Sequence, residues 1–119
     1  MEIAAFSITC LVALAHVYFL VLEMFLWKTA FGRKVFRTTP EDAARTAVLA
    51  ANQGLYNGFL VAGLVWGLYY GVRAGRPILS FFLVCIVVAG LFGAATANKR
   101  ILFVQAVPAL AALVLLRLL

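Results

Sequence analysis

Long apolar runs separated by short charged segments dominate the chain. The runs cover about residues 3–27, 48–72, 78–97 and 101–119. With a helical rise of about 1.5 Å per residue, each run is long enough to cross a hydrocarbon core of roughly 30 Å. A helix also satisfies its own backbone hydrogen bonds, which a single strand in lipid cannot do. The pattern therefore predicts an all-α integral membrane protein, in which a single domain over residues 1–119 forms a four-helix antiparallel bundle.

The segments between the runs carry helix-start and turn signals. Residues 39–42 read Thr-Pro-Glu-Asp, an N-cap followed by proline at the first helical position and two acids at the positive end of the helix dipole. The second helix is therefore expected to begin near Pro40 and to enter the membrane near Val48. Tight turns are expected at residues 73–77 and 98–100, and links this short make neighbouring helices antiparallel.

The composition agrees with a membrane location. Of the 119 residues, 66% are hydrophobic and 12% are charged, and the mean hydropathy is +1.10. A water-soluble domain needs more charge to cover its surface. The net charge of +6 comes mostly from basic residues between the apolar runs, which we interpret as topology signals and not as a nucleic-acid surface. Membrane lipids are the expected partners.

The basic residues divide unequally between the two ends of the predicted helices. Loops one and three carry seven of them, against three at the other end: Lys28, Arg33, Lys34, Arg37, Arg45, Lys99 and Arg100, compared with Arg73, Arg76 and Arg117. The positive-inside rule then places loops one and three in the cytoplasm and both termini outside it. Loop one has two interpretations: flanking charges that fix topology, or an interfacial segment whose Phe31, Val35 and Phe36 share one face.

Polar side chains recur inside the predicted spans. The candidate site residues are Glu23, Arg45, Asn52, Gln53, Tyr56, Asn57 and Gln105. Because an unpaired polar group in hydrocarbon costs several kcal/mol, these groups are expected to face inward. Glu23 is expected to pair with Arg45 or with the amides of Asn52 and Gln53, or to remain protonated. Polar side chains of this kind either form hydrogen bonds that hold helices together or line a ligand site.

Several other residues have predicted roles. His16 precedes Glu23 by seven residues on the same helical face, so the two could form a proton relay, and no spacing favours a metal site. Cys10 and Cys85 lie within apolar runs and are expected to be buried small hydrophobes. Trp27 is expected to be an anchor at the membrane interface. Pro108 is expected to kink the fourth helix.

Glycines line two faces of the second predicted helix. Gly54 and Gly58 share one face, and Gly63, Gly67 and Gly71 share the opposite one. Small residues allow helix backbones to approach closely in a membrane. We therefore expect this helix to lie at the centre of a bundle or oligomer and to carry homo-oligomerisation.

Three segments carry a resemblance to a known family. HVYFLVLEMFLW, VLAANQGLYNGFLVAGL and NKRILFVQAVPAL resemble the small bacterial four-helix integral membrane family of the domain of unknown function thirteen-oh-four. The resemblance covers essentially the whole chain. It implies a multi-pass protein of the bacterial inner (plasma) membrane and brings no activity with it.

A more distant similarity is to the membrane-associated eicosanoid and glutathione metabolism superfamily. It rests on the basic loop, Arg45, the AANQ segment, Asn57, and NKRILF at the start of a fourth helix. The similarity implies trimers that bind lipophilic substrates, and often glutathione, between protomers. In this register Asn57 replaces a glutamate of the enzymes, and only Arg45 remains of an arginine-rich segment. A negatively charged cofactor would lack those partners, so no cofactor is expected.

Three functional hypotheses follow, and a binding role is favoured over an enzymatic one. The first is binding of a lipid-like or other lipophilic ligand in a cytoplasmic-side cavity lined by Glu23, Asn52, Gln53, Tyr56, Asn57 and Gln105. The second is a glutathione-dependent membrane enzyme, with Arg45 and Lys99 or Arg100 as anion anchors and Tyr56 activating the thiol. The third is a small transporter or assembly factor that uses His16 and Glu23 as a proton relay.

Overall fold

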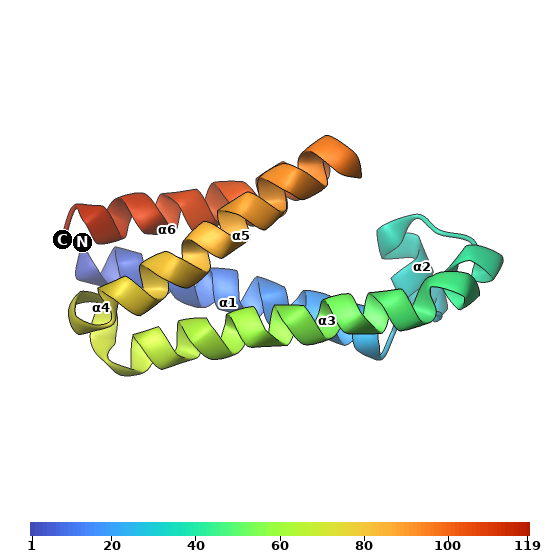
Figure 1. Cartoon of the computed structure of the whole chain (residues 1–119), viewed down its shortest axis with the longest axis horizontal. Coiled ribbons are helices and arrows are strands. Elements are labelled where there is room, and N and C mark those ends of the chain that lie inside the picture. Colours follow the sequence, from blue (N-terminus) through green and yellow to red (C-terminus); the bar gives the residue numbers. More distant parts are fainter. The chain divides into compact units, whose positions relative to one another are not determined.

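The computed structural model describes residues 1–119, and every regular element in it is helical. The elements are α1 (Glu2–Met24), α2 (Ala30–Phe36), α3 (Pro40–Tyr69), α4 (Gly71–Ala74), α5 (Arg76–Thr96), the π-helical segment η1 (Leu102–Ala106) and α6 (Val107–Arg117) (Figure 1). Three of them, α1, α3 and α5, are long and apolar enough to cross a membrane. A shorter apolar helix covers Leu102–Arg117. The prediction of an all-α chain of apolar helices is therefore confirmed.

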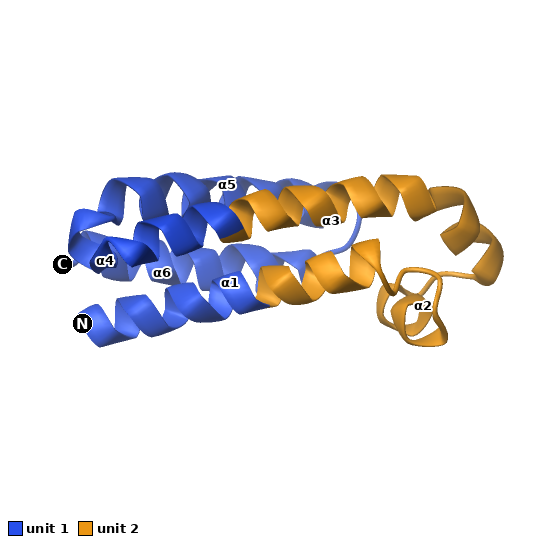
Figure 2. Ribbon diagram, turned by 90° about the horizontal axis from the view of Figure 1, so that it is seen from below, with its two compact units in different colours: residues 1–14, 62–119 blue, residues 15–61 orange.

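The chain forms two compact units, which Figure 2 distinguishes by colour. Unit 1 comprises Met1–Leu14 and Ala62–Leu119, and unit 2 comprises Ala15–Val61. Because α1 and α3 are long, each contributes to both units. Unit 2 holds the connection between α1 and α3 and most of the predicted site residues.

In unit 2, the chain leaves α1 at Met24, three residues before the predicted end, and forms the short helix α2. Thr29 caps α2, since the Gly32 N–H donates to its Oγ1 at 3.1 Å. A Cβ at Gly32 would lie only 1.9 Å from the Leu26 carbonyl oxygen. Glycine at this position therefore lets α2 pack directly on the turn that follows α1, which the apolar pattern alone does not reveal.

Helix α3 begins at Pro40, as the Thr-Pro-Glu-Asp segment predicts. The Thr39 Oγ1 accepts a hydrogen bond from the Asp42 N–H at 3.1 Å and so satisfies one free donor of the first turn. The helix ends at Tyr69, whereas the apolar pattern predicts a span to residue 72. The physical reason is Gly71, whose φ of 86° is incompatible with a right-handed helix.

The first glycine face of α3 packs on α1 within unit 2. A Cβ at Gly54 would lie 2.5 Å from the Met24 side chain, and one at Gly58 would lie 3.0 Å from Leu20. As residue numbers rise along α3, those of its neighbours on α1 fall. The two segments therefore pack closely and antiparallel.

The second glycine face of α3 packs on α5 within unit 1. A Cβ at Gly63 would lie 2.3 Å from the Phe82 ring, and one at Gly67 would lie 2.5 Å from the Leu79 side chain. The order of these contacts again makes the pair antiparallel. Gly63 and Gly67, which were predicted to carry oligomerisation, are thus already covered by a helix of the same chain.

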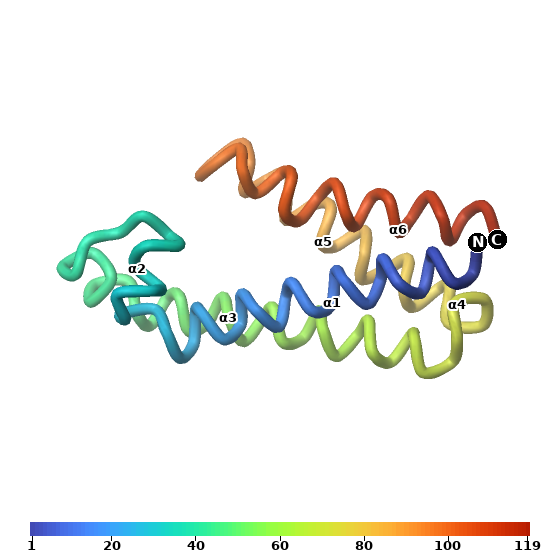
Figure 3. The backbone as a smooth tube through the Cα atoms, turned by 180° about the vertical axis from the view of Figure 1, so that it is seen from behind, coloured from blue at the N-terminus to red at the C-terminus, as the bar shows by residue number.

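The last apolar run of unit 1, in which Pro108 predicts a kink, contains a π-helical segment just before that proline. The Val107 N–H bonds to the Leu102 carbonyl, five residues earlier, so the helix widens into η1 just before Pro108. A Cβ at Gly90 would lie 2.8 Å from the Ala106 backbone nitrogen, so α5 approaches this wide turn closely. Figure 3 shows α5 and α6 side by side.

Arg73 contacts residues at both ends of the chain within unit 1. Its guanidinium pairs with the Glu2 carboxylate and donates to the Leu119 carbonyl oxygen at 3.0 Å. Glu2, α4 and Leu119 therefore lie at one end of unit 1, where Figure 1 also shows the two termini close together. Cys10 and Cys85, expected to be buried, are free thiols that are half-buried.

Candidate functional site

Glu23 in the last turn of α1 is the only carboxylate that the chain buries. It is 7% exposed, and its Oε1 accepts a hydrogen bond of 2.6 Å from the Asn57 Nδ2. The close packing at Gly54 makes this bond possible, since a Cβ at Gly54 would lie 3.2 Å from the Glu23 Cβ. Gly54 and Asn57, three residues apart on α3, therefore bring the two helices together and hold the Glu23 carboxylate in a fixed orientation.

This geometry corrects the prediction that Glu23 pairs with Arg45, Asn52 or Gln53. Relative to Gly54, which faces α1, Asn52 and Arg45 lie about 160° and 180° around α3, on its opposite side. Arg45 pairs with Asp42 one turn earlier on α3, and its side chain is 76% exposed. Arg45, Asn52 and Tyr56 do form a polar stripe along α3, but this stripe faces away from α1.

The remaining amides and hydroxyls of α3 lie at the surface of the chain. Asn52 and Gln53 are exposed, and Tyr56 is 63% exposed, with its ring edge against Phe59. Of the polar side chains predicted in this helix, only Asn57 contacts Glu23. Gln105 is half-buried in η1, which belongs to unit 1.

His16 is buried on the same face of α1 as Glu23. It is 1% exposed, and its ring meets Phe19 edge-on with 5.6 Å between ring centroids. Two titratable side chains of α1 are thus buried two helical turns apart. No three His, Cys, Asp or Glu side chains gather closely enough to hold a metal ion.

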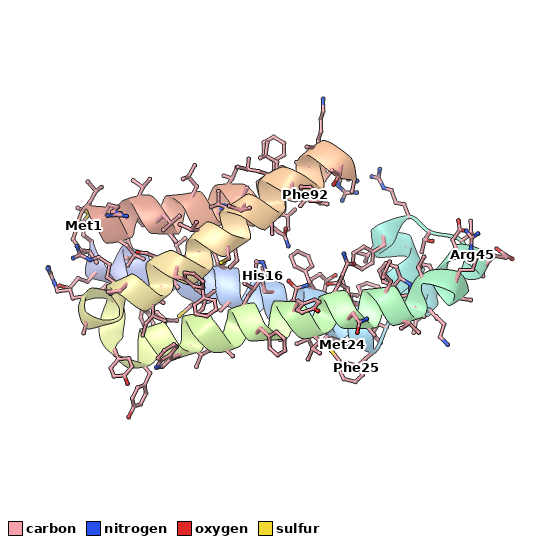
Figure 4. The ribbon with its side chains drawn as sticks, viewed as in Figure 1. Met1, His16, Met24, Phe25, Arg45 and Phe92 are labelled. Carbon is pink, nitrogen blue, oxygen red and sulfur yellow. The ribbon has the colours of Figure 1, made fainter.

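An open hollow of about 300 Å³ lies beside Glu23, and we call it the Glu23 hollow. Its lining residues are Glu23, Met24, Phe25, Trp27, Lys28, Thr29 and Ala47. Figure 4 shows Phe25 projecting outward from the end of α1. Only Glu23 of this lining was predicted as a site residue. The sequence EMFLWKT does place a carboxylate, two aromatic rings and a lysine together, and that signal could have found the hollow.

Trp27 fixes one wall of the Glu23 hollow. Its indole N–H donates to the Ala43 carbonyl oxygen at 3.1 Å and to the Thr46 Oγ1 at 3.2 Å, and its ring lies 4.8 Å from that of Phe36. Trp27 thereby ties the α1–α3 connection to the first turns of α3. It also lines a second open hollow of about 450 Å³, with Phe36, Thr38, Asp42, Arg45, Thr46, Leu49, Ala50 and Gln53.

The site lies within a region shared with known proteins. Residues 10–117 match the family described as protein of unknown function (DUF1304). The chain belongs to this family. It is 33% identical over 116 residues to the "Uncharacterized protein YpaA" of Lactococcus lactis subsp. lactis (strain IL1403), which covers 96% of this chain and 97% of that relative. No solved structure matches the chain.

The first family resemblance is therefore confirmed, and the more distant one stays a prediction. In this DUF1304 protein, the Glu23 hollow offers a fixed carboxylate, an exposed lysine and aromatic walls at the end of an apolar helix. Such a lining can contact a molecule that is polar at one end and apolar at the other.

Proposed function

We propose that this protein binds a lipid-like amphiphile within the membrane, with the polar end of the ligand in the Glu23 hollow. The observation that carries the proposal is the Glu23 carboxylate, which is almost buried, is held by Asn57 and lines an open hollow. Placing a carboxylate in a membrane-spanning helix costs free energy because the carboxylate loses its hydration. In this protein Asn57 replaces that hydration on one side, and a ligand replaces it on the other.

The apolar part of the ligand lies along the exposed side chains beside the hollow. Phe25 is 70% exposed and Met24 is 36% exposed, and both line the hollow next to Glu23. An acyl chain can leave the polar group and follow this surface into the surrounding lipid. Because the hollow is open, it suits a ligand whose acyl chain extends out of it better than a ligand that must be fully enclosed.

The proposal places this site on the cytoplasmic side of a bacterial inner membrane. The seven basic residues of loops one and three support that orientation. The contacts of Arg73 with Glu2 and Leu119 support placing both termini on the other side, outside the cytoplasm. We also propose that the four apolar helices pack as one antiparallel bundle.

The exposed amides of α3 support a further part of the proposal, a homo-oligomer. Asn52, Gln53 and Tyr56 lie on the outer face of a membrane-spanning helix. Their side chains would be unsatisfied against hydrocarbon, so we propose that a second copy of the chain covers them. The distant superfamily resemblance favours a trimer.

A second candidate function, a proton-coupled transporter, is favoured by the burial of His16. His16 and Glu23 are the two titratable side chains buried on α1, and they share one face of the helix. Proton-driven flux of solute into liposomes, lost in both His16→Gln and Glu23→Gln, would favour this function over simple binding.

The experiment that tests ligand binding uses the variant Glu23→Gln. Glutamine keeps the size of the side chain and an acceptor for Asn57, so we expect near-native melting. Mass spectrometry of the purified protein should show a changed complement of co-purified lipophiles. The control variant is Glu41→Gln, which changes an exposed acid at the start of α3 outside the hollow. If the Glu23→Gln protein melts far lower and retains the same lipophiles, the Glu23–Asn57 pair is a structural contact and not part of a ligand site.

A further inference from the structure

The polar side chains that line the Glu23 hollow differ in how many hydrogen-bonding groups they leave free for a ligand. The Trp27 indole N–H is already used by Ala43 and Thr46. The Thr29 hydroxyl donates to the Leu26 carbonyl oxygen at 2.7 Å and accepts from the Gly32 N–H at 3.1 Å. Neither side chain is therefore free to recognise a ligand strongly. The remaining polar side chains of the lining are Glu23 and Lys28.

Glu23 and Lys28, an acid and a base, line the same hollow without pairing with each other. The salt bridges of the chain are Arg45–Asp42 and Arg73–Glu2, and neither involves Glu23 or Lys28. Asn57 donates to Oε1 of Glu23, which leaves the second carboxylate oxygen for another donor. The exposed Lys28 ammonium has three N–H donors for an anion.

From this arrangement we infer that the Glu23 hollow selects a zwitterionic head group with a primary ammonium and a phosphate, the chemistry of an aminophospholipid. The inference rests on the proposed function and names its ligand class. The ammonium of the head group donates to the Glu23 carboxylate, and the phosphate accepts from Lys28. Each charge of the hollow then meets one of opposite sign.

Other common lipid head groups fit the hollow less well. A head group that carries only negative charge meets the Glu23 carboxylate with like charge and leaves that acceptor unsatisfied. A trimethylammonium head group has no N–H to donate to Glu23, although it can lie against the Trp27 ring. The volume of about 300 Å³ holds a head group and leaves the acyl chains outside, along Phe25.

Lipid competition on the full-length protein tests the inference. The purified chain is reconstituted in nanodiscs with equal amounts of phosphatidylethanolamine, phosphatidylglycerol and phosphatidylcholine, and native mass spectrometry measures the lipids that remain bound. We expect phosphatidylethanolamine to be enriched about three- to tenfold over the bulk mixture, the ratio for a free-energy difference near 1 kcal/mol. Glu23→Gln should abolish its preference over phosphatidylglycerol. Lys28→Gln should lower retention of all three phospholipids.

The control is Lys34→Gln, which removes an exposed cation of α2 that does not line the hollow and should leave retention unchanged. Because Lys28 is exposed, its variant should fold even if Glu23→Gln does not. Enrichment of phosphatidylglycerol or phosphatidylcholine in the wild type would overturn the head-group inference and leave lipid binding intact. Equal loss of retention in Lys34→Gln and Lys28→Gln would also overturn it. Absence of any retained lipid would overturn the proposed function as well.

Discussion

Trp27 shows how a single side chain can organise the end of a membrane helix. Its N–H reaches two acceptors on the first turns of α3, and its ring packs on Phe36 of the connection. Trp27 was predicted to be a membrane-interface anchor, and these contacts add a packing role within the chain. The same ring lines the Glu23 hollow, so one residue takes part both in the packing of the chain and in the candidate site.

Replacing Trp27 with Phe should therefore destabilise the protein. The variant loses both hydrogen bonds and leaves the Ala43 carbonyl without its side-chain donor, so we expect a loss of about 1–2 kcal/mol in the free energy of unfolding. Thermal unfolding in a mild detergent measures the change. Trp66→Phe is the matched control, since Trp66 is 54% exposed on α3. Equal melting of the two variants would contradict the packing role.

Among the elements, α3 is the one whose limits follow most directly from local chemistry. Its start is set by Thr39 and Pro40, and its end by the positive φ of Gly71. Between these points, one glycine face meets α1 in unit 2 and the other meets α5 in unit 1. The helix thus uses its small residues for packing within the chain, and its polar stripe faces outward.

Thr39→Ala should weaken the start of α3. The Thr39 hydroxyl is the side-chain acceptor for the Asp42 N–H, and loss of an N-cap costs about 0.5–2 kcal/mol. Hydrogen exchange should show faster exchange in the first turn of α3, with little change beyond Val48. For comparison, Thr96→Ala removes a hydroxyl that only bonds back to Phe92 at the end of α5. Unchanged exchange at Asp42 would argue against the cap.

At the scale of the whole molecule, the outer face of α3 and the two chain ends are the informative features. Asn52, Gln53 and Tyr56 are polar and exposed, whereas Gly63 and Gly67 are covered by α5. The proposed oligomer is therefore best tested at the amides and not at the glycines. Substituting the glycines would disrupt the α3–α5 packing of each chain before it reported on assembly.

The double variant Asn52→Leu/Gln53→Leu should reduce oligomerisation. Leucine is compatible with lipid, so each chain should remain folded while the hydrogen bonds between copies are lost. Native mass spectrometry in mild detergent should show a shift to smaller assemblies. Val65→Leu, on an exposed apolar position of α3, should leave the mass unchanged. A monomeric wild type, or an unchanged mass of the double variant, would rule out this interface.

Reporter enzymes fused to each terminus test the orientation. Because Arg73 contacts both Glu2 and Leu119, we expect both fusions to report the same side of the membrane. The bias of basic residues predicts that this side is outside the cytoplasm. Cytoplasmic activity of the C-terminal fusion would reverse the proposed orientation of the Glu23 hollow.

Local chemistry explains which features could be predicted from the residues alone. Apolar runs must be helical in lipid because their backbone groups need partners, so the all-α class and the apolar helices are readable from composition and length. The start of α3 is readable because an N-cap acts over three residues. A departure from regular α-helix near Pro108 could be predicted because proline lacks an N–H, whereas its π-helical form could not. The family is readable from segments spread along the chain.

Which polar residues meet depends on how the helices pack. Helical periodicity places Asn52 and Asn57 on different faces of α3, but it does not say which face packs on α1. The close approach at Gly54 decides this, and it selects Asn57 as the partner of Glu23 and leaves Arg45 to Asp42. The Glu23 hollow likewise depends on the early end of α1 at Met24 and on the contact between Gly32 and Leu26. These features arise from contacts between residues distant along the chain or from a backbone turn, and an apolar pattern contains neither.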